Sequence, residues 1–258
     1  MNVDGSTDLK GLTAVVTGSS SGIGRAIARE LAAAGAACLV HARRSAEAAQ
    51  ETARELAALK VATHVELCDL SDIAAHAGFV ERAWQWRDGI DIWVNNAGAD
   101  VLTGEAGRWP FERKLAELLR VDVEATVGLS RAVGRRMKER GRGSIVNIGW
   151  DQAETGMAGD SGELFATSKG AVMAFTKSLA RSLAPEVRVN CVAPGWIQTS
   201  WGRGASEYWQ RRAERESLLA RWGQPEDVAR VVRFLASDDA AFVTGHVLPV
   251  NGGLRQTE

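Results

Sequence analysis

Two residues whose types bear directly on proton transfer lie in one short segment, 165–169, which begins with Phe165 and ends with Lys169. Residues four apart on a helix share one face, so we expect Phe165 and Lys169 to lie side by side. A phenylalanine ring has no exchangeable proton, so Phe165 cannot act as a general acid. The chain contains a single tyrosine, Tyr208. If the chemistry needs a phenol, Tyr208 is therefore the sole candidate.

A glycine-rich loop near the N-terminus has the spacing Gly-x-x-x-Gly-x-Gly, formed by Gly18, Gly22 and Gly24. It follows a short apolar run and opens a helical pattern. Glycines permit a tight turn and let backbone N–H groups approach a pyrophosphate at a helix N-terminus, where the helix dipole favours negative charge. This strand–loop–helix order is the context that dinucleotide binding requires. The alternative interpretation is a purely structural turn.

Short apolar runs alternate with longer helical patterns along the chain. The expected strands cover 13–17, 37–41, 61–68, 90–95, 144–148, 187–192 and 246–250, and the expected helices cover about 22–34, 46–59, 73–87, 111–140, 162–183 and 225–237. This alternation predicts right-handed β-α-β units and a parallel sheet with helices on both faces. We therefore expect one doubly wound α/β domain over residues 1–258, with a lid-like segment at about 196–221.

The composition excludes several classes of protein. The formal net charge is −1, which argues against a partner such as nucleic acid or an anionic membrane surface. No apolar run approaches the roughly 18 residues of a membrane span, and residues 1–10 are too polar for a signal peptide. Cys38, Cys68 and Cys191 form an odd set without metal-binding or redox spacing. They indicate buried, reduced thiols in a cytoplasmic protein, without a metal site or disulfide.

Several segments in the same order resemble the short-chain dehydrogenase/reductase family, from about residue 9 to residue 253. They are the glycine-rich loop, Cys68-Asp69-Leu70, Asn95-Asn96-Ala97-Gly98, 144–148, Asn190-Cys191-Val192-Ala193-Pro194-Gly195 and 245–253. The resemblance implies a Rossmann-type domain with a parallel seven-stranded sheet, a nicotinamide cofactor and a small-molecule substrate. The apolar surface of the helices at 111–140 and 162–183 exceeds what one sheet face needs, as in relatives that form homo-oligomers. We expect a homotetramer.

The resemblance also assigns the residues that contact the nicotinamide dinucleotide. Asp69 and Leu70 flank the adenine, and Lys169 holds the nicotinamide ribose. The remaining contacts are Gly18, Ser20, Ser21, Gly22, Ile23, Gly24, Asn96, Ala97, Gly98, Pro194, Gly195, Ile197 and Thr199. The last four of these are expected to meet the nicotinamide.

The second strand ends without the acid that an NAD-binding protein would use there. A carboxylate at this point accepts a hydrogen bond from the ribose 2′-OH of NAD. Here the chain has Ala42, followed by Arg43 and Arg44. No acid repels a 2′-phosphate, and two guanidinium groups are available to bind it. The sequence favours NADP(H) over NAD(H); the alternative is that both arginines are solvated charges at the start of a helix.

The catalytic residues of the family are only partly present. An ordinary member has an Asn, a Ser and a Tyr-x-x-x-Lys motif, in which the tyrosine exchanges a proton with the substrate oxygen and the lysine lowers the pKa of that tyrosine. Lys169 is retained, but Phe165 stands at the tyrosine and Asp122 at the asparagine. The serine position falls within 150–152, which reads Trp-Asp-Gln and contains no hydroxyl. Three altered positions out of four indicate a naturally divergent member.

Carboxylates replace the lost groups. The family fold brings Asp122, Asp151, Glu154 and Glu163 towards the pocket, and the candidate catalytic residues are Lys169, Asp122, Asp151 and Glu154. A carboxylate beside Lys169 would form an ion pair, and two adjacent carboxylates oppose each other's ionisation, which leaves one as a proton donor. Asp151 or Glu154 is the expected donor. Glu154 and Glu163 fit equally well as solvated loop residues.

Tryptophans are unusually frequent near the expected pocket. Trp150, Trp196, Trp201 and Trp209 either line an apolar cavity or pack in the core or at a subunit contact. Tyr208 lies among them in the lid-like segment. It either reaches the pocket when the lid closes or belongs to an amphipathic helix that packs the lid down.

Three functions remain open at this level. The first is an NADP(H)-dependent short-chain oxidoreductase that acts on a small carbonyl or alcohol substrate with an atypical proton donor. The second is a non-redox enzyme, such as an isomerase, dehydratase or cyclase, that uses carboxylates near Lys169. The third is a cofactor-binding subunit without catalysis. A shared fold does not decide between them, because function depends on the site.

Overall fold

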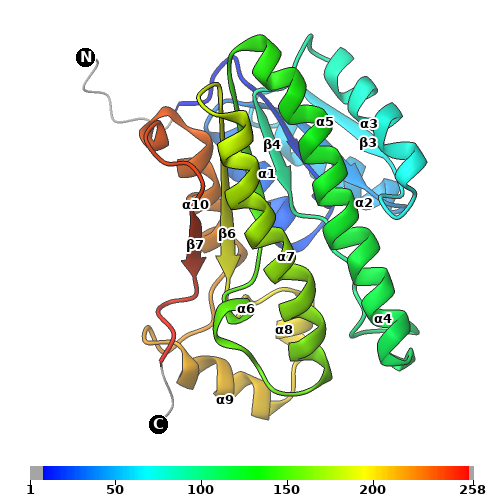
Figure 1. The fold of residues 1–258 in the computed structure, drawn as a ribbon, viewed down its shortest axis with the longest axis vertical. Coiled ribbons are helices and arrows are strands. Elements are labelled where there is room, and N and C mark those ends of the chain that lie inside the picture. Colours follow the sequence, from blue (N-terminus) through cyan, green and yellow to red (C-terminus); the bar gives the residue numbers. More distant parts are fainter. Residues whose placement is uncertain (1–7, 256–258) are drawn as a thin grey trace.

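Seven parallel strands form one sheet in the order β3-β2-β1-β4-β5-β6-β7 (Figure 1). Their bounds are β1 Thr13–Val16, β2 Ala37–Ala42, β3 Thr63–Leu67, β4 Ile92–Asn95, β5 Gly143–Ile148, β6 Val187–Pro194 and β7 Val247–Val250. The computed structural model describes residues 8–255, except for the side chain of Trp201. The doubly wound α/β prediction and all seven strands are confirmed, while the ends of the expected 1–258 domain lie outside the described residues.

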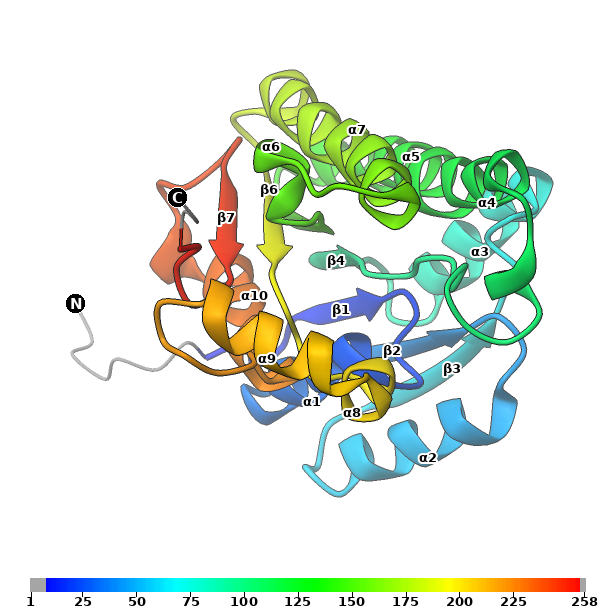
Figure 2. The ribbon, with the colours of Figure 1, turned by 90° about the horizontal axis from the view of Figure 1, so that it is seen from below.

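Helices cover both faces of this sheet. They are α1 Gly22–Ala33, α2 Ala46–Ala57, α3 Ile73–Gln85, α4 Phe111–Leu118, α5 Ala125–Arg140, α6 Gln152–Thr155, α7 Asp160–Leu183, α8 Ser200–Gly204, α9 Glu207–Glu216 and α10 Pro225–Ala236, with 3-10 turns at Ala106–Arg108 and Asp238–Ala240. Figure 2 shows α1, α2 and α10 on one face and α3, α5 and α7 on the other. Within residues 8–255, none of the helices combines the length and apolar content needed to cross a bilayer.

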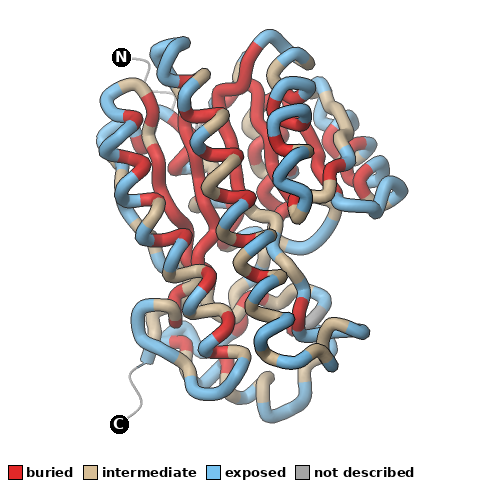
Figure 3. Tube along the Cα trace, turned by 45° about the vertical axis from the view of Figure 1, so that its right-hand side comes forward, coloured by how far each residue is buried: buried red, intermediate tan, exposed pale blue. Residues whose placement is uncertain are grey.

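The central strands are mostly apolar because both faces of the sheet are covered there. Every residue of β1 and β2 is buried, and the strands form a buried central layer in Figure 3. Ile27 and Leu31 of α1 pack in the core on one face, and Phe79 and Leu129 pack in the core on the other. Burial on both faces fixes the strands, and therefore the loops that leave them.

The expected helix over 111–140 is helical throughout, but it is not α-helical along its whole length. Between α4 and α5 the chain forms a π-helical stretch, Leu119–Glu124. The widened π turn shifts the face on which the following side chains lie, and such turns inside helices are frequent at functional sites. Asp122 lies in this stretch and is only 1% exposed. The helical prediction over 111–140 is therefore confirmed, but hydrophobic periodicity did not register the widened turn inside it.

The chain changes direction across the sheet between β1 and β4. β2 and β3 lie on one side of β1, and β4 to β7 lie on the other side. In open parallel sheets, ligands bind at this switch point, outside the carboxyl ends of the strands. Figure 1 shows β6 and β7 pointing towards α6, α8 and α9. The segment 196–221, which contains α8 and α9, therefore lies at the end of the sheet where a ligand is expected.

Candidate active site

Two cavities at the carboxyl ends of the strands share Ile23 and Thr199 in their walls. One, of about 590 Å³, follows the glycine-rich loop and the ends of β2, β3 and β4, and we call it the glycine-loop cavity. The other, of about 490 Å³, contains Lys169 and four tryptophans, and we call it the tryptophan cavity. The four are Trp150, Trp196, Trp209 and Trp222.

Nearly all the predicted cofactor-contacting residues line these cavities. Those in the glycine-loop cavity are Gly18, Ser20, Ser21, Gly22, Ile23, Gly24, Arg43, Asp69, Leu70, Asn96, Ala97, Gly98 and Thr199. Those in the tryptophan cavity are Ile23, Lys169, Pro194, Gly195, Ile197 and Thr199. Arg44 is the exception, because its side chain is 79% exposed and belongs to neither wall.

Close backbone contacts set the shape of the glycine-rich loop. Gly18 has a φ of +63°, a conformation that side chains disfavour. A Cβ at Gly24 would lie 2.2 Å from the Gly18 carbonyl oxygen and 2.4 Å from Nδ2 of Asn96. That amide nitrogen donates to the carbonyl oxygens of Thr17 and Gly18 at 3.0 and 3.1 Å. The residue that follows β4 therefore holds the loop that follows β1.

His41, near the end of β2, supports the same loop from a buried position. Its Nδ1 accepts a hydrogen bond from the Gly18 N–H at 3.0 Å, so Nε2 carries the proton and donates to the Cys68 carbonyl at 3.0 Å. The contact at Nδ1 requires the neutral imidazole, because a protonated Nδ1 cannot accept. Burial lowers the pKa of His41 from 6.5 to about 4. The ring therefore stays neutral at pH 7 and connects the loop to the end of β3.

The N-terminus of α1 presents unpaired amides to the glycine-loop cavity. Gly22, Ile23 and Gly24 form its first turn and line the cavity. The N–H groups of a first turn have no intrahelical acceptor, and Ser21 at the N-cap makes no capping hydrogen bond. These donors and the helix dipole suit a phosphate anion. The loop and helix therefore fit the pyrophosphate of a dinucleotide.

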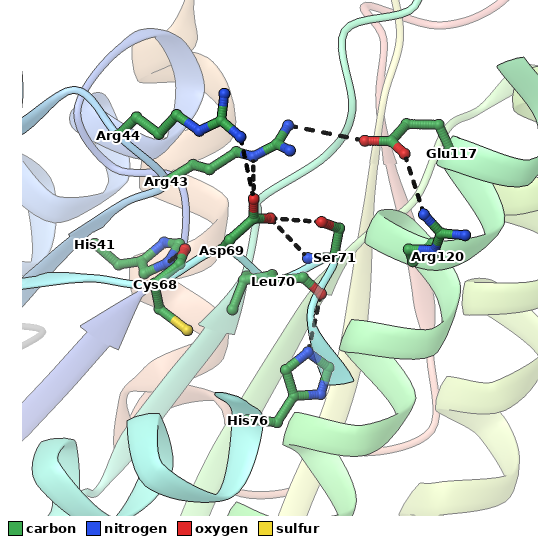
Figure 4. A network of polar contacts seen from close by, with 10 residues as sticks. All are labelled: His41, Arg43, Arg44, Cys68, Asp69, Leu70, Ser71, His76, Glu117 and Arg120. Carbon is green, nitrogen blue, oxygen red and sulfur yellow. Dashed lines mark hydrogen bonds and ion pairs between the residues drawn. The ribbon is translucent and has the colours of Figure 1, made fainter. Parts of the chain in front are cut away.

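A charged network borders the glycine-loop cavity (Figure 4). Nε of Arg43 donates to Oδ2 of Asp69 at 2.7 Å, and Nη1 of Arg43 lies 3.8 Å from Oε1 of Glu117. The backbone N–H and hydroxyl of Ser71 donate to Oδ1 of Asp69. Burial opposes ionisation of Asp69, but these hydrogen bonds outweigh it and hold its pKa below the usual value. Asp69 therefore orients Arg43 through Nε. Asp69 and Glu117 both line this cavity, whereas Ala42 at the end of β2 adds no further carboxylate.

Lys169 and Asp122 form a buried ion pair at the tryptophan cavity. Nζ of Lys169 lies 2.8 Å from Oδ2 of Asp122, and the two side chains are 13% and 1% exposed. Oδ1 of Asp122 accepts from the Ala99 N–H at 2.8 Å, and Nζ also donates to the Ile148 carbonyl at 3.3 Å. Lys169 belongs to the cavity wall. Since an ammonium has three N–H donors, one remains for a ligand.

None of the four predicted carboxylates, Asp122 included, lines either cavity in the described part of the chain. Asp151 is buried, and its Oδ2 accepts from Nδ2 of Asn251 at 3.0 Å while its Oδ1 accepts from the first backbone N–H of α6. Burial raises the pKa of Asp151. Glu154 and Glu163 are exposed. Of the four predicted carboxylates, the structure thus places only that of Asp122 beside Lys169.

The walls of the tryptophan cavity are almost wholly apolar. Phe165 lies one turn before Lys169 on α7, and its ring meets that of Trp150 nearly edge-on, with centroids 6.3 Å apart. The other apolar side chains are Ile23, Leu102, Ile148, Met157, Trp196, Ile197, Trp209 and Trp222. Phe165 therefore occupies the wall where an ordinary relative would present a phenol.

Tryptophans also hold the segment after β6 against this cavity. The Trp196 ring packs against Trp209 and Trp222, with centroids 5.4 and 6.1 Å away. Nε1 of Trp196 donates to Oε2 of Glu216 at 2.8 Å. Arg212 pairs with the same carboxylate at 2.6 Å, and its guanidinium lies over the Trp209 ring. This packing connects α9 to the chain that leaves β6.

The single tyrosine is not part of the cavity wall. Tyr208 is 61% exposed, and its ring packs nearly perpendicular to that of Trp209 at 5.2 Å. It borders a separate surface hollow with the arginines of α9. The expectation that Trp201 lines the pocket concerns a side chain outside the described residues. Of the two interpretations of Tyr208, the arrangement matches the amphipathic helix.

Some functional positions were missed from the sequence. Ser161 lines the tryptophan cavity, and its spacing of four and eight residues from Phe165 and Lys169 was a usable signal. Glu117 and Asn251 had no such signal, because their contacts join distant parts of the chain. They reach Arg43 and Asp151 only through the folded structure.

The fold and the glycine-loop cavity are those of a Rossmann-type dinucleotide-binding domain, and the tryptophan cavity adjoins that cavity. Residues 18–255 match the family model described as enoyl-(acyl carrier protein) reductase. The chain is 40% identical over 252 residues to the 3-oxoacyl-[acyl-carrier-protein] reductase FabG of Aquifex aeolicus, covering 95% of this chain and 98% of that protein. The chain belongs to the short-chain dehydrogenase/reductase family and is an oxidoreductase of that type.

Solved structures of the family are similar over nearly the whole chain. A 7α-hydroxysteroid dehydrogenase in complex with NADH and 7-oxo glycochenodeoxycholic acid has a TM-score of 0.88 and 28% identity, covering 98% of this chain and 97% of that chain. A gluconate 5-dehydrogenase from Burkholderia cenocepacia J2315, in complex with NADP and tartrate, has a TM-score of 0.86 and 32% identity, covering 96% and 97%. These relatives differ in both cofactor and substrate, so the choice for this chain depends on its own residues.

Proposed function

We propose that the protein is an NADP(H)-dependent oxidoreductase that reduces a small carbonyl compound, or oxidises the alcohol, with Lys169 as the proton donor. The observation that carries this proposal is the position of Nζ of Lys169. It belongs to the wall of the tryptophan cavity, 2.8 Å from Asp122, with one N–H left for a ligand. Among the described side chains of that wall, Lys169 is the only ionisable proton donor.

The residues at the glycine-loop cavity support NADP(H). The first turn of α1 offers amides to the pyrophosphate, and Ala42 presents no carboxylate to repel a 2′-phosphate. Asp69 engages Nε of Arg43 and Glu117 lies 3.8 Å from Nη1, so Nη2 of the guanidinium remains for a phosphate. Pro194, with the residues that follow it, is the proposed contact for the nicotinamide.

The proposed reaction uses Lys169 and Asp122 together. When bound, NADPH supplies the hydride that reduces the carbonyl carbon. Nζ of Lys169 hydrogen-bonds the carbonyl oxygen and gives it a proton, which completes the alcohol. The Asp122 carboxylate and the Ile148 carbonyl hold Nζ in place, and the lysine regains a proton from water. The apolar walls exclude bulk water from the reacting atoms.

We also propose a homotetramer in the cytoplasm, with 196–221 acting as a lid. The three cysteines are buried free thiols, which suits a reducing compartment. The lid proposal is supported by the tryptophans at 196 and 209, which reach the cavity wall from this segment. Light scattering at micromolar concentration tests the assembly, and a monomer would overturn that part of the proposal.

The test of the reaction is consumption of NADPH with a panel of ketones, followed by absorbance. Lys169→Arg is the matched variant, because arginine keeps the positive charge but cannot release its proton. We expect Lys169→Arg to bind NADPH and to lose about 100-fold or more in kcat. Equal turnover by Lys169→Arg overturns the role of Lys169. NADPH binding without turnover of any ketone favours the non-redox enzyme or the non-catalytic subunit.

A further inference from the structure

The tryptophan cavity offers a ligand almost no unpaired charge. Lys169 is the only charged side chain among the described residues of its wall, and Asp122 pairs with that ammonium at 2.8 Å. A carboxylate or phosphate in this cavity would have no free cation as its partner. Taking a charged group out of water without a partner is strongly unfavourable. The cavity therefore selects an uncharged molecule.

Aromatic side chains dominate the same wall. They are Trp150, Phe165, Trp196, Trp209 and Trp222. Aromatic rings favour offset-stacked or edge-to-face contact with other rings, in addition to the burial of apolar area. A polyhydroxylated substrate would instead leave several hydroxyls without partners, and each unsatisfied buried polar group is costly. The wall therefore favours a ring system over a sugar acid.

One hydroxyl interrupts the apolar wall away from the glycine-loop cavity. Ser161, in the first turn of α7, is half-buried and lines the tryptophan cavity with Phe165 and Lys169. These three residues are four apart and lie in a row along one helix face. The row is about 12 Å long, because an α-helix rises 1.5 Å per residue. Within residues 8–255, the Ser161 hydroxyl has no hydrogen-bond partner.

We propose that the substrate is an uncharged, ring-bearing carbonyl compound with a second hydrogen-bonding group, which Ser161 recognises. The carbonyl lies at Lys169, the rings lie against Phe165 and Trp150, and the second polar group lies at Ser161. This inference rests on the proposed function, because it assigns the carbonyl end to Lys169. Ser161 is a specificity-determining residue in this arrangement, since it contacts the substrate away from the reacting atoms.

Three probes test the proposal: acetylnaphthalene, its analogue with a hydroxyl at the far end of the ring system, and a keto sugar acid. Calorimetry measures their binding, and NADPH consumption measures their reduction. We expect both naphthalene probes to bind at least about tenfold more tightly than the keto sugar acid. Ser161→Ala should weaken binding of the hydroxylated probe about three- to tenfold, the effect of one hydrogen bond, and change the parent probe less than about twofold.

Thr167→Ala is the matched control, because Thr167 is an exposed hydroxyl of the same helix that lines neither cavity. It should leave both probes unchanged. Tighter binding of the keto sugar acid, or an equal effect of Ser161→Ala on both naphthalene probes, overturns the inference. Selective binding without NADPH consumption leaves the inference standing and overturns the proposed reaction. Reduction of the keto sugar acid, with reduction of neither naphthalene probe, overturns the inference and leaves the proposed reaction standing.

Discussion

Nζ of Lys169 and Oδ2 of Asp122 are 2.8 Å apart, one on α7 and the other on the π-helical stretch between α4 and α5. The resemblance to the family predicts an asparagine at the position of Asp122. An amide there would hydrogen-bond its neighbours without a charge, whereas the carboxylate forms an ion pair with the lysine. Phe165 and Lys169 lie on one face of α7, and Asp122 is the ion-pair partner of Lys169. The missing phenol and the added carboxylate therefore affect the surroundings of the same lysine.

Removing the carboxylate of this pair should destabilise the protein. Asp122→Ala leaves the lysine without its charge partner and the Ala99 N–H without an acceptor, so we expect the free energy of unfolding to fall by about 3 kcal/mol. Asp122→Asn keeps an acceptor and should cost less. The exposed pair of Glu207 and Arg211 is the control, and Glu207→Gln should change stability by less than about 0.5 kcal/mol in urea denaturation. Equal effects at both pairs would contradict the burial argument.

The sheet was predictable because its central strands are short, largely apolar runs. β1 and β2 are buried on both faces, so their sequence needs no alternation to be recognised. The phosphate-binding end was predictable for a related reason, since Gly18 and Gly24 are required by local backbone geometry. Features set by nearby residues were therefore visible in the sequence.

The catalytic end was less predictable because its geometry depends on distant contacts. The pairing of Asp122 with Lys169 needs a π turn that periodicity does not register. Asp151 looked equally suitable, but Asn251 binds its carboxylate from the far end of the chain. Residue type and position along the chain do not reveal which carboxylate already accepts hydrogen bonds from a distant residue.

The buried His41 should make stability fall in mild acid. Its pKa is about 4 in the folded protein, below the usual 6.5. Between these values the unfolded state binds the extra proton, so stability is fully present above pH 6.5 and is lost as the pH falls towards 4, by at most about 3 kcal/mol. His41→Asn should flatten this part of the profile. Urea denaturation of the wild-type protein and of His41→Asn at several pH values isolates the contribution of His41. If the free energy of unfolding depends on pH equally in the two proteins, the neutral, buried state of His41 is contradicted.

A methyl group at Gly24 should disrupt the glycine-rich loop. The new Cβ would lie 2.2 Å from the Gly18 carbonyl oxygen and 2.4 Å from Nδ2 of Asn96, so the loop must move. We expect Gly24→Ala to weaken NADPH binding about tenfold or more by calorimetry. Gly78→Ala is the control, because Gly78 is an exposed helical residue whose Cβ would meet only the end of the Arg82 side chain. Comparable losses in both variants would show that the close approach at Gly24 is unimportant.

Restoring a phenol on α7 should accelerate the proposed reaction. Phe165 lines the tryptophan cavity one turn before Lys169, so Phe165→Tyr adds a proton donor to the same wall. General acid catalysis contributes roughly 100-fold or more when well placed, and we expect a gain in kcat of about tenfold or more. Phe165→Leu removes the ring without adding a donor and should give no gain. Unchanged kcat in Phe165→Tyr, despite normal NADPH binding, would mean that Lys169 already supplies the proton at full rate.

Arg43 should determine the preference for NADPH. Its guanidinium lines the glycine-loop cavity beside Ala42, whereas Arg44 lies outside the wall and is 79% exposed. A charge-assisted hydrogen bond contributes about 1.5–3 kcal/mol, so Arg43→Ala should weaken NADPH about tenfold or more and leave NADH almost unchanged. Arg44→Ala, the matched control, should have a small effect on NADPH binding.

Glu117→Gln should instead strengthen NADPH binding, because it removes a carboxylate 3.8 Å from Nη1 of Arg43 that would repel the 2′-phosphate. Calorimetric titration of each variant with both cofactors provides the measurement, and equal losses for NADPH and NADH in Arg43→Ala would refute the assignment.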